Sequence, residues 1–114
     1  MQYLLLLYVD ESGWDRLTPA QKAEGLAAYT AYGEALRKAG AFINSNRLSP
    51  AATATTVRVR DGKSQVLDGP YTETKEQVGG YYLIDAPDLD AAIAWAAKVP
   101  SARHGSVEVR PVWA

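Results

Sequence analysis

The residues best suited to chemistry lie in the segment LDGPYTETKEQVGGYY, residues 67–82, where Asp68, Glu73, Lys75 and Glu76 stand between a Gly-Pro pair and a Gly-Gly pair. Carboxylates beside a lysine at a sheet edge could hold perturbed pKa values and perform acid/base work. This reading makes Asp68 or Glu76 the base and Lys75 its electrostatic partner. We therefore name Asp68, Lys75 and Glu76 as candidate catalytic residues.

The same segment also has structural readings. Asp68 could accept a hydrogen bond from the Tyr71 N–H in a turn, and Thr74 and Gln77 could form a capping box around one helical turn that ends at Gly79. The charges could pair across a dimer interface, which would make the chain a structural dimerisation module. Three carboxylates within nine residues could also hold a hard cation, but their spacing matches no known metal loop.

Residues outside this segment add candidates for ligand binding rather than for a reaction. His104, the only histidine, lies in the sequence SARHG, and no spacing of serine, histidine and aspartate suggests a nucleophile elbow or a triad. Arg110 shares a strand face with Glu108, so an ion pair is expected between them. No glycine pattern suggests phosphate binding, and we expect no cofactor. We assign ligand binding to Arg47, Tyr71, Glu73 and Arg110.

Composition limits the partners and the compartment. The chain has 114 residues, 47% of them hydrophobic and 22% charged, with a net charge of -1 and no cysteine. These values predict one globular domain over residues 1–114, without disulfides, as in a reducing cytoplasm. A surface without excess positive charge gives no basis for nucleic-acid binding. The apolar run near the start is too short to cross a membrane and predicts a buried first strand.

Hydrophobic spacing and turn residues predict the order β-α-β-β-(short β)-β-α-β. Strands are expected at residues 3–9, 41–48, 80–86 and 107–113, and helices at residues 18–40 and 87–99, with a loop at residues 10–17. The helix faces expected to be buried are Leu26, Tyr29, Gly33 and Leu36 in the first helix, and Ile93, Trp95, Ala96 and Ala97 in the second. Between them, Asp61 and Gly62 predict a type I′ turn that closes a hairpin beginning at Thr55.

This order predicts a ferredoxin-like α+β fold, an antiparallel sheet with two helices on one face. The strands nevertheless carry apolar residues on both faces, including Tyr8, Tyr81 and Trp113. A second copy of the chain would cover the free face, so we expect a homodimer.

The segment DGPYTETKEQVGGYY, together with the C-terminal GSVEVRPVW, resembles the DGPF branch of the YCII-related proteins. The residues that match its signature are Asp68, Gly69, Pro70, Glu73, Lys75, Glu76, Gly79, Gly80, Glu108, Val109, Arg110 and Pro111, with Tyr71 in place of phenylalanine. The resemblance covers nearly the whole chain and implies a bacterial, dimeric α/β barrel. It implies no particular reaction. The histidine and aspartate found near the first helix in the narrower YCII branch have no counterpart between Ala20 and Gly40.

Together these observations predict a domain that binds a small polar organic molecule in a pocket near the Asp68–Glu76 loop. The fusion of relatives to sigma factors favours binding. An acid/base enzyme acting on a small polar metabolite is the alternative, with Arg110 or Lys75 as the electrostatic partner.

Overall fold

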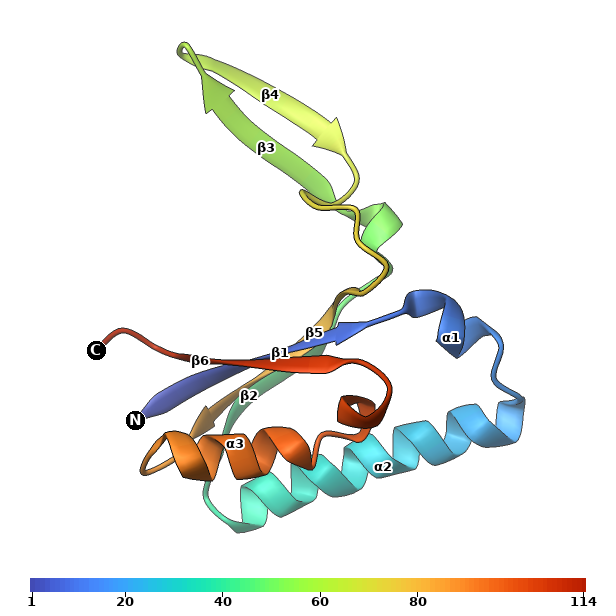
Figure 1. Cartoon of the computed structure of the whole chain (residues 1–114), viewed down its shortest axis with the longest axis vertical. Helices are drawn as coiled ribbons and strands as arrows, with labels where there is room; N and C mark the ends of the chain where they lie inside the picture. Colours follow the sequence, from blue (N-terminus) through green and yellow to red (C-terminus); the bar gives the residue numbers. More distant parts are fainter.

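The computed structural model describes residues 1–114 as an α+β fold, which confirms the predicted class. Four antiparallel strands form the main sheet in the order β2-β5-β1-β6, and two helices, α2 and α3, lie on one of its faces (Figure 1). This is the strand order of the ferredoxin-like plan. The elements of this body are β1 (Gln2–Val9), α1 (Glu11–Asp15), α2 (Pro19–Lys38), β2 (Phe42–Arg47), β5 (Gln77–Asp85), α3 (Leu89–Ala97) and β6 (Ser106–Pro111).

The register of β1 against β5 separates two faces of the sheet. Leu5 pairs with Tyr82, and both side chains are buried beneath the helices. Leu4 pairs with Leu83 and Leu6 pairs with Tyr81, on the opposite face, where all four residues are only half-buried. We call this second surface the open face. It is apolar at its centre because β1 is apolar at every position from Tyr3 to Val9.

Helix α2 begins and ends where its sequence predicts. Thr18 and Gln21 form the expected capping box, and Gly40, with φ of +72°, follows the last turn. The expected buried face is wrong at one position, because Leu26 is 51% exposed while Tyr32 is buried. The Tyr32 hydroxyl donates a hydrogen bond of 2.8 Å to the Trp95 carbonyl. The buried residues of α2 all lie in its C-terminal half.

The expected face of α3 also needs correction. Ala92 and Ala96 are buried, whereas Ile93 is 49% exposed and Ala97 is exposed. The small side chains on the inner side of α3 let it approach β6 closely, and the larger Ile93 lies outside. The capping by Asp88 agrees with the prediction, since its carboxylate accepts a hydrogen bond from the Ala91 N–H at 2.9 Å.

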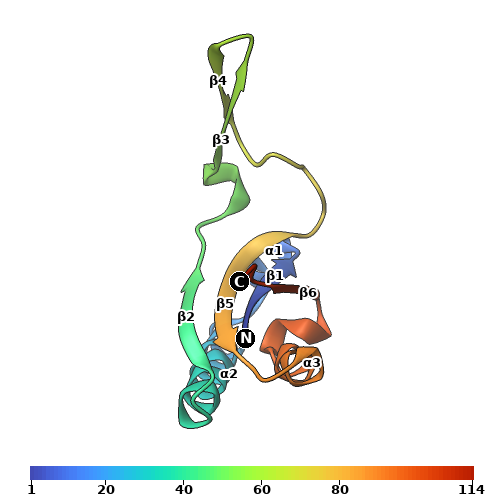
Figure 2. The same ribbon diagram turned by 90° about the vertical axis from the view of Figure 1, so that its left-hand side faces the viewer.

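Strands β3 (Thr55–Arg60) and β4 (Lys63–Asp68) form a separate hairpin that projects away from the body (Figures 1 and 2). Asp61 and Gly62 have φ of +52° and +74°, which confirms the predicted turn with positive φ. One face of the hairpin carries valines that remain largely exposed: Val57, Val59 and Val66.

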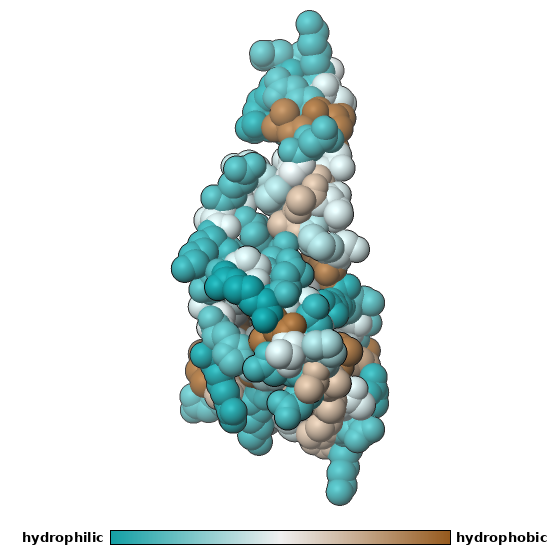
Figure 3. Space-filling model, turned by 90° about the vertical axis from the view of Figure 1, so that its right-hand side faces the viewer, coloured by the Kyte–Doolittle hydropathy of each residue, from teal (hydrophilic) through white to brown (hydrophobic).

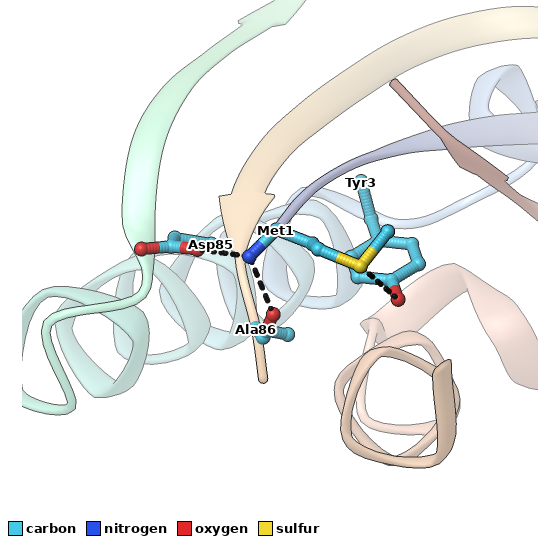
Figure 4. A network of polar contacts seen from close by, with 4 residues as sticks. All are labelled: Met1, Tyr3, Asp85 and Ala86. Carbon is cyan, nitrogen blue, oxygen red and sulfur yellow. Dashed lines mark hydrogen bonds and ion pairs between the residues drawn. The ribbon is translucent and has the colours of Figure 1, made fainter. Parts of the chain in front are cut away.

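At the end of the sheet away from the hairpin, polar contacts hold the N-terminal residue. The Met1 ammonium lies 3.1 Å from an Asp85 carboxylate oxygen and donates to the Ala86 carbonyl at the same distance (Figure 4). Both ion-pair partners are more than half exposed, so this pair fixes the start of β1 but adds little stability. No helix is long and apolar enough to cross a membrane.

Candidate ligand-binding groove

The larger of two main cavities is a groove of about 1480 Å³ between α2, helix α1 and the edge of the sheet. Tyr82, Gly80 and Ser45 line it from the sheet, Tyr29 from α2 and Trp14 from α1. On α2 the groove extends from Gln21 to Arg37. Figure 3 shows the molecule from the side that carries α1, where apolar atoms are enclosed by a mainly polar surface.

Helix α1 lies where the sequence predicts a loop, and the loop expectation is wrong because Asp10 caps the segment. Its carboxylate accepts hydrogen bonds from the Ser12 N–H at 3.1 Å and the Ser12 hydroxyl at 2.7 Å. Glu11 then accepts from the Ala51 N–H through both carboxylate oxygens, at 2.8 and 3.1 Å. These contacts hold α1 against the segment that leads into the hairpin, and so position Trp14 at the groove.

The capping also lowers the pKa of Asp10. The side-chain hydrogen bond from Ser12 is the largest cause, followed by the backbone hydrogen bond from Ser12, and the charges of Lys75 and Arg16 act in the same direction. Asp10 is therefore an ionised capping group at neutral pH and a weak base.

Replacing Asp10 by alanine should loosen α1 and expose Trp14 to solvent. Because the pKa of Asp10 is lower when folded, its ionisation stabilises the folded chain above the ordinary pKa of an aspartate. That contribution is lost as the pH falls through the folded pKa. At pH 7 we expect a red shift of tryptophan emission in Asp10→Ala and a smaller change in Asp10→Asn, which keeps an acceptor oxygen. Equal spectra for both variants and the parent would contradict the capping role.

Two arginine side chains in the groove stack on aromatic rings. The Arg47 guanidinium carbon lies 4.7 Å from the centroid of the Trp14 ring, and that of Arg37 lies 4.2 Å from the centroid of Phe42. Glycines make room for this arrangement. A Cβ at Gly25 would lie 3.3 Å from the Trp14 ring, and one at Gly33 would lie 3.3 Å from an Arg37 nitrogen.

The inner end of the groove holds Tyr82 and Ser101. Burial raises the pKa of Tyr82, the neighbouring Tyr29 raises it further, and the charge of Arg37 opposes both. The Ser101 side chain is buried, and its hydroxyl oxygen has no hydrogen-bond partner. The Ser101 carbonyl does have partners, the N–H groups of His104 and Gly105, at 3.1 and 2.8 Å.

The YCII-related domain model matches residues 1–114, the full length of the chain. The chain belongs to the YCII-related family. It is 37% identical over 114 residues to the uncharacterized protein R00369 of Rhizobium meliloti (strain 1021), a match that covers 98% of this chain and 92% of that protein. The resemblance seen in the loop and at the C-terminus is thus confirmed at the level of the family.

This YCII-related chain does not gather the predicted catalytic residues at one point. Asp68 ends β4 on the projecting hairpin, where its side chain is exposed and accepts no hydrogen bond from Tyr71. Lys75 is exposed, near enough to Asp10 to affect its pKa. Glu76 lies directly before β5, and its carboxylate accepts a hydrogen bond of 3.3 Å from the Ser106 hydroxyl.

The predicted ligand-binding residues are also distributed. Arg47 lines the groove, whereas Arg110 pairs with Glu108 at 2.6 Å, as expected from their shared strand face. Tyr71 is 81% exposed and borders a second cavity of about 770 Å³ beside the loop, and Glu73 is exposed and lines neither cavity. No charged side chain lines that second cavity.

The expected helical turn at residues 74–79 is wrong. Residues 69–76 form no helix or strand, and β5 starts at Gln77. The Gln77 side-chain amide instead donates to the carbonyls of Thr72 and Thr74, at 2.8 and 2.9 Å. Pairing of β5 with β1 uses the backbone that a helix would need, so the sheet determines the conformation here.

The groove contains functional candidates that sequence reasoning missed, namely Trp14, Arg37, Tyr82 and Ser101. A signal for two of them was present. Gly25 and Gly33 inside a helix indicate close packing, and the structure shows that the groups they accommodate are Trp14 and Arg37. Nothing in the sequence near Ser101 distinguishes it from an ordinary loop serine.

Proposed function

We propose that this protein binds a small organic molecule in the groove between α1, α2 and the sheet. The observation that carries the proposal is the cavity itself, in which partly buried aromatic side chains lie among many polar and charged groups, including Arg37, Arg47 and Ser101. Ligand sites are commonly concave, with aromatic walls that contact the ligand and polar groups that orient it.

The groove adjoins the charged loop that the sequence singles out. Asp10 lines the groove, and Lys75 contributes to the low pKa of Asp10, so the loop approaches the groove at that edge. Asp68, Glu73, Lys75 and Glu76 do not line it. We favour binding over acid/base chemistry because Asp68 lies on the hairpin while Lys75 and Glu76 lie beside β5.

A tryptophan at position 28 tests the groove. Ala28 is exposed and lines the groove from α2, so Ala28→Trp should fill it and weaken ligand binding at least tenfold, about 1.4 kcal/mol. Ala31→Trp, three residues further along the same helix and outside the groove, is the matched control. Binding is measured by ligand-observed NMR with a library of small metabolites, and by native mass spectrometry of the purified protein for a retained compound.

Two outcomes would overturn the proposal. If compounds bind the parent and bind Ala28→Trp equally well, the groove is not the binding site. If the parent retains no compound and no library member binds, the chain is not a receptor for small metabolites. Melting curves for both variants confirm that each is folded.

We further propose that a second copy of the chain covers the open face. Leu4, Leu6, Tyr8, Tyr81 and Leu83 form a half-buried apolar surface there, on the side of the sheet away from α2 and α3. A sheet with one face covered by helices and an apolar second face is a common basis for homodimers. The groove and the open face adjoin at Tyr81, which belongs to both surfaces.

A further inference from the structure

We infer that the groove selects a ligand that carries a carboxylate or phosphate group on a planar apolar body. The inference deepens the proposed function, on which it rests, by naming the chemical class of ligand. It depends on three features of the groove: unpaired guanidinium groups, a buried hydroxyl without a partner, and aromatic walls.

The two stacked arginines have no anionic partner in the chain. The ion pairs of the protein join Met1 to Asp85 and Arg110 to Glu108, and neither involves Arg37 or Arg47. Stacking on Phe42 and Trp14 restrains each guanidinium, while its N–H groups remain free to donate. A guanidinium restrained in this way loses less entropy when it binds a carboxylate or a phosphate through two parallel hydrogen bonds.

Carboxylates also border the groove, and their positions matter. Both oxygens of Glu11 accept the Ala51 N–H, and Asp10 is engaged with Ser12. The other three, Asp15, Glu24 and Glu34, are exposed on the helices and form no ion pair with the groove arginines. Salt screens such exposed charges at long range, and Arg37 and Arg47 are exposed as well, so direct contact with a guanidinium decides whether an anion binds. The two stacks lie at opposite ends of β2, so a small anion contacts either Arg37 or Arg47.

Ser101 supplies the second observation. Its side chain is 7% exposed, lines the groove and has a hydroxyl oxygen with no hydrogen-bond partner. Buried polar groups are nearly always hydrogen-bonded, so an unpaired one at a cavity wall indicates a missing partner. A ligand oxygen in the groove would accept from this hydroxyl.

The shape of the remaining wall favours a planar ligand. Trp14, Tyr29, Phe42 and Tyr82 line the groove together with two sheet glycines, Gly79 and Gly80. A Cβ at Gly80 would lie 2.9 Å from the Asn46 carbonyl, so this part of the wall must stay without a side chain. Flat apolar rings stack on aromatic side chains with little loss of conformational freedom.

Three compounds of one shape test the inference: naphthalene-1-carboxylate, 1-naphthyl phosphate and the neutral 1-naphthamide. Titration is followed by tryptophan emission and by NMR of the Trp14 indole N–H. We expect at least one of the two anions to bind about tenfold more tightly than the amide, and their order distinguishes a carboxylate site from a phosphate site. In one of the two variants Arg37→Gln and Arg47→Gln, the one that removes the contacted guanidinium, the preferred anion should lose about tenfold in affinity, while the amide is unchanged. Arg60→Gln, on the projecting hairpin, is the matched control and should bind all three as the parent does.

The outcomes separate this inference from the proposed function. Equal affinity for the anions and the amide, with all three blocked by Ala28→Trp, overturns the anion preference and leaves small-molecule binding in the groove intact. Absence of binding by both anions at millimolar concentration also overturns the preference, whatever the metabolite library shows. Loss of the preference in Arg60→Gln to the same extent as in Arg47→Gln would show that overall charge, rather than the groove, attracts the anion.

Discussion

Replacing Gly105 by alanine is expected to lower the free energy of unfolding by about 2–4 kcal/mol, the largest effect of alanine at any glycine of this chain. A Cβ at this position would lie 2.0 Å from the backbone carbonyl oxygen of Tyr8 and 3.2 Å from the carbonyl carbon. A backbone group paired within the sheet has no rotamer with which to avoid the clash. Either β1 or the start of β6 must move.

Thermal unfolding followed by circular dichroism measures this effect. For a chain of 114 residues, each kcal/mol corresponds to about 4 °C, so Gly105→Ala should melt about 8–16 °C below the parent. Gly13→Ala is the control, because a Cβ there meets nothing within 4 Å and the residue lies inside α1. The control should be unchanged or slightly more stable. A Gly105→Ala melting temperature close to that of the parent would mean that this contact is wrongly described.

Features determined by local chemistry could be predicted from the sequence. Asp61 and Gly62 adopt positive φ because few other residue pairs do so at low energy, and Thr18 with Gln21 caps α2 through groups only three residues apart. The strand order follows from the alternation of elements, because a helix that connects two strands of one sheet limits how they can be placed.

Features determined by tertiary packing could not be predicted. Periodicity predicts an apolar side for α2, but it does not predict where along the helix the contact with the sheet ends. The pattern therefore predicts that Leu26 is buried, whereas in the structure Leu26 is exposed and Tyr32 is buried. In α3 the hydrophobicity of Ile93 favoured burial, yet the close approach of the helix favours Ala92 and Ala96.

The candidate site shows the same division. The sequence predicts Arg47 as a ligand-binding residue, and Arg47 does line the groove. Its stacking partner Trp14 lies more than thirty residues earlier, in a segment for which the sequence predicts a loop. The stack forms because the end of β2 passes beside α1, and that proximity is a property of the folded sheet. The four charges of the loop predict a site because they are close together in the sequence. The fold instead places Asp68 on the hairpin and Glu76 at the sheet.

The largest effect expected on assembly comes from Leu6→Arg. Leu6 is opposite Tyr81 on one side and Glu108 on the other, so it lies at the middle of the open face. If a second copy covers that face, the substitution places two arginines, one from each chain, in a largely apolar contact where the neighbouring Glu108 is already paired with Arg110. Burying unpaired like charges is costly, and the dissociation constant of the dimer should rise at least a hundredfold, about 2.7 kcal/mol.

Sedimentation velocity at micromolar concentration distinguishes the outcomes, with circular dichroism to confirm that each variant is folded. Ile93→Arg is the matched control, because it adds the same charge at an apolar residue that is 49% exposed on α3, away from the open face. The parent and Ile93→Arg should sediment as dimers, and Leu6→Arg as a folded monomer. A parent chain that is a stable, folded monomer at micromolar concentration would refute the dimer, and a dimeric Leu6→Arg would place the contact elsewhere. Leu6 does not line the groove, whereas its neighbour Tyr81 does, so groove ligands should still bind the monomeric variant.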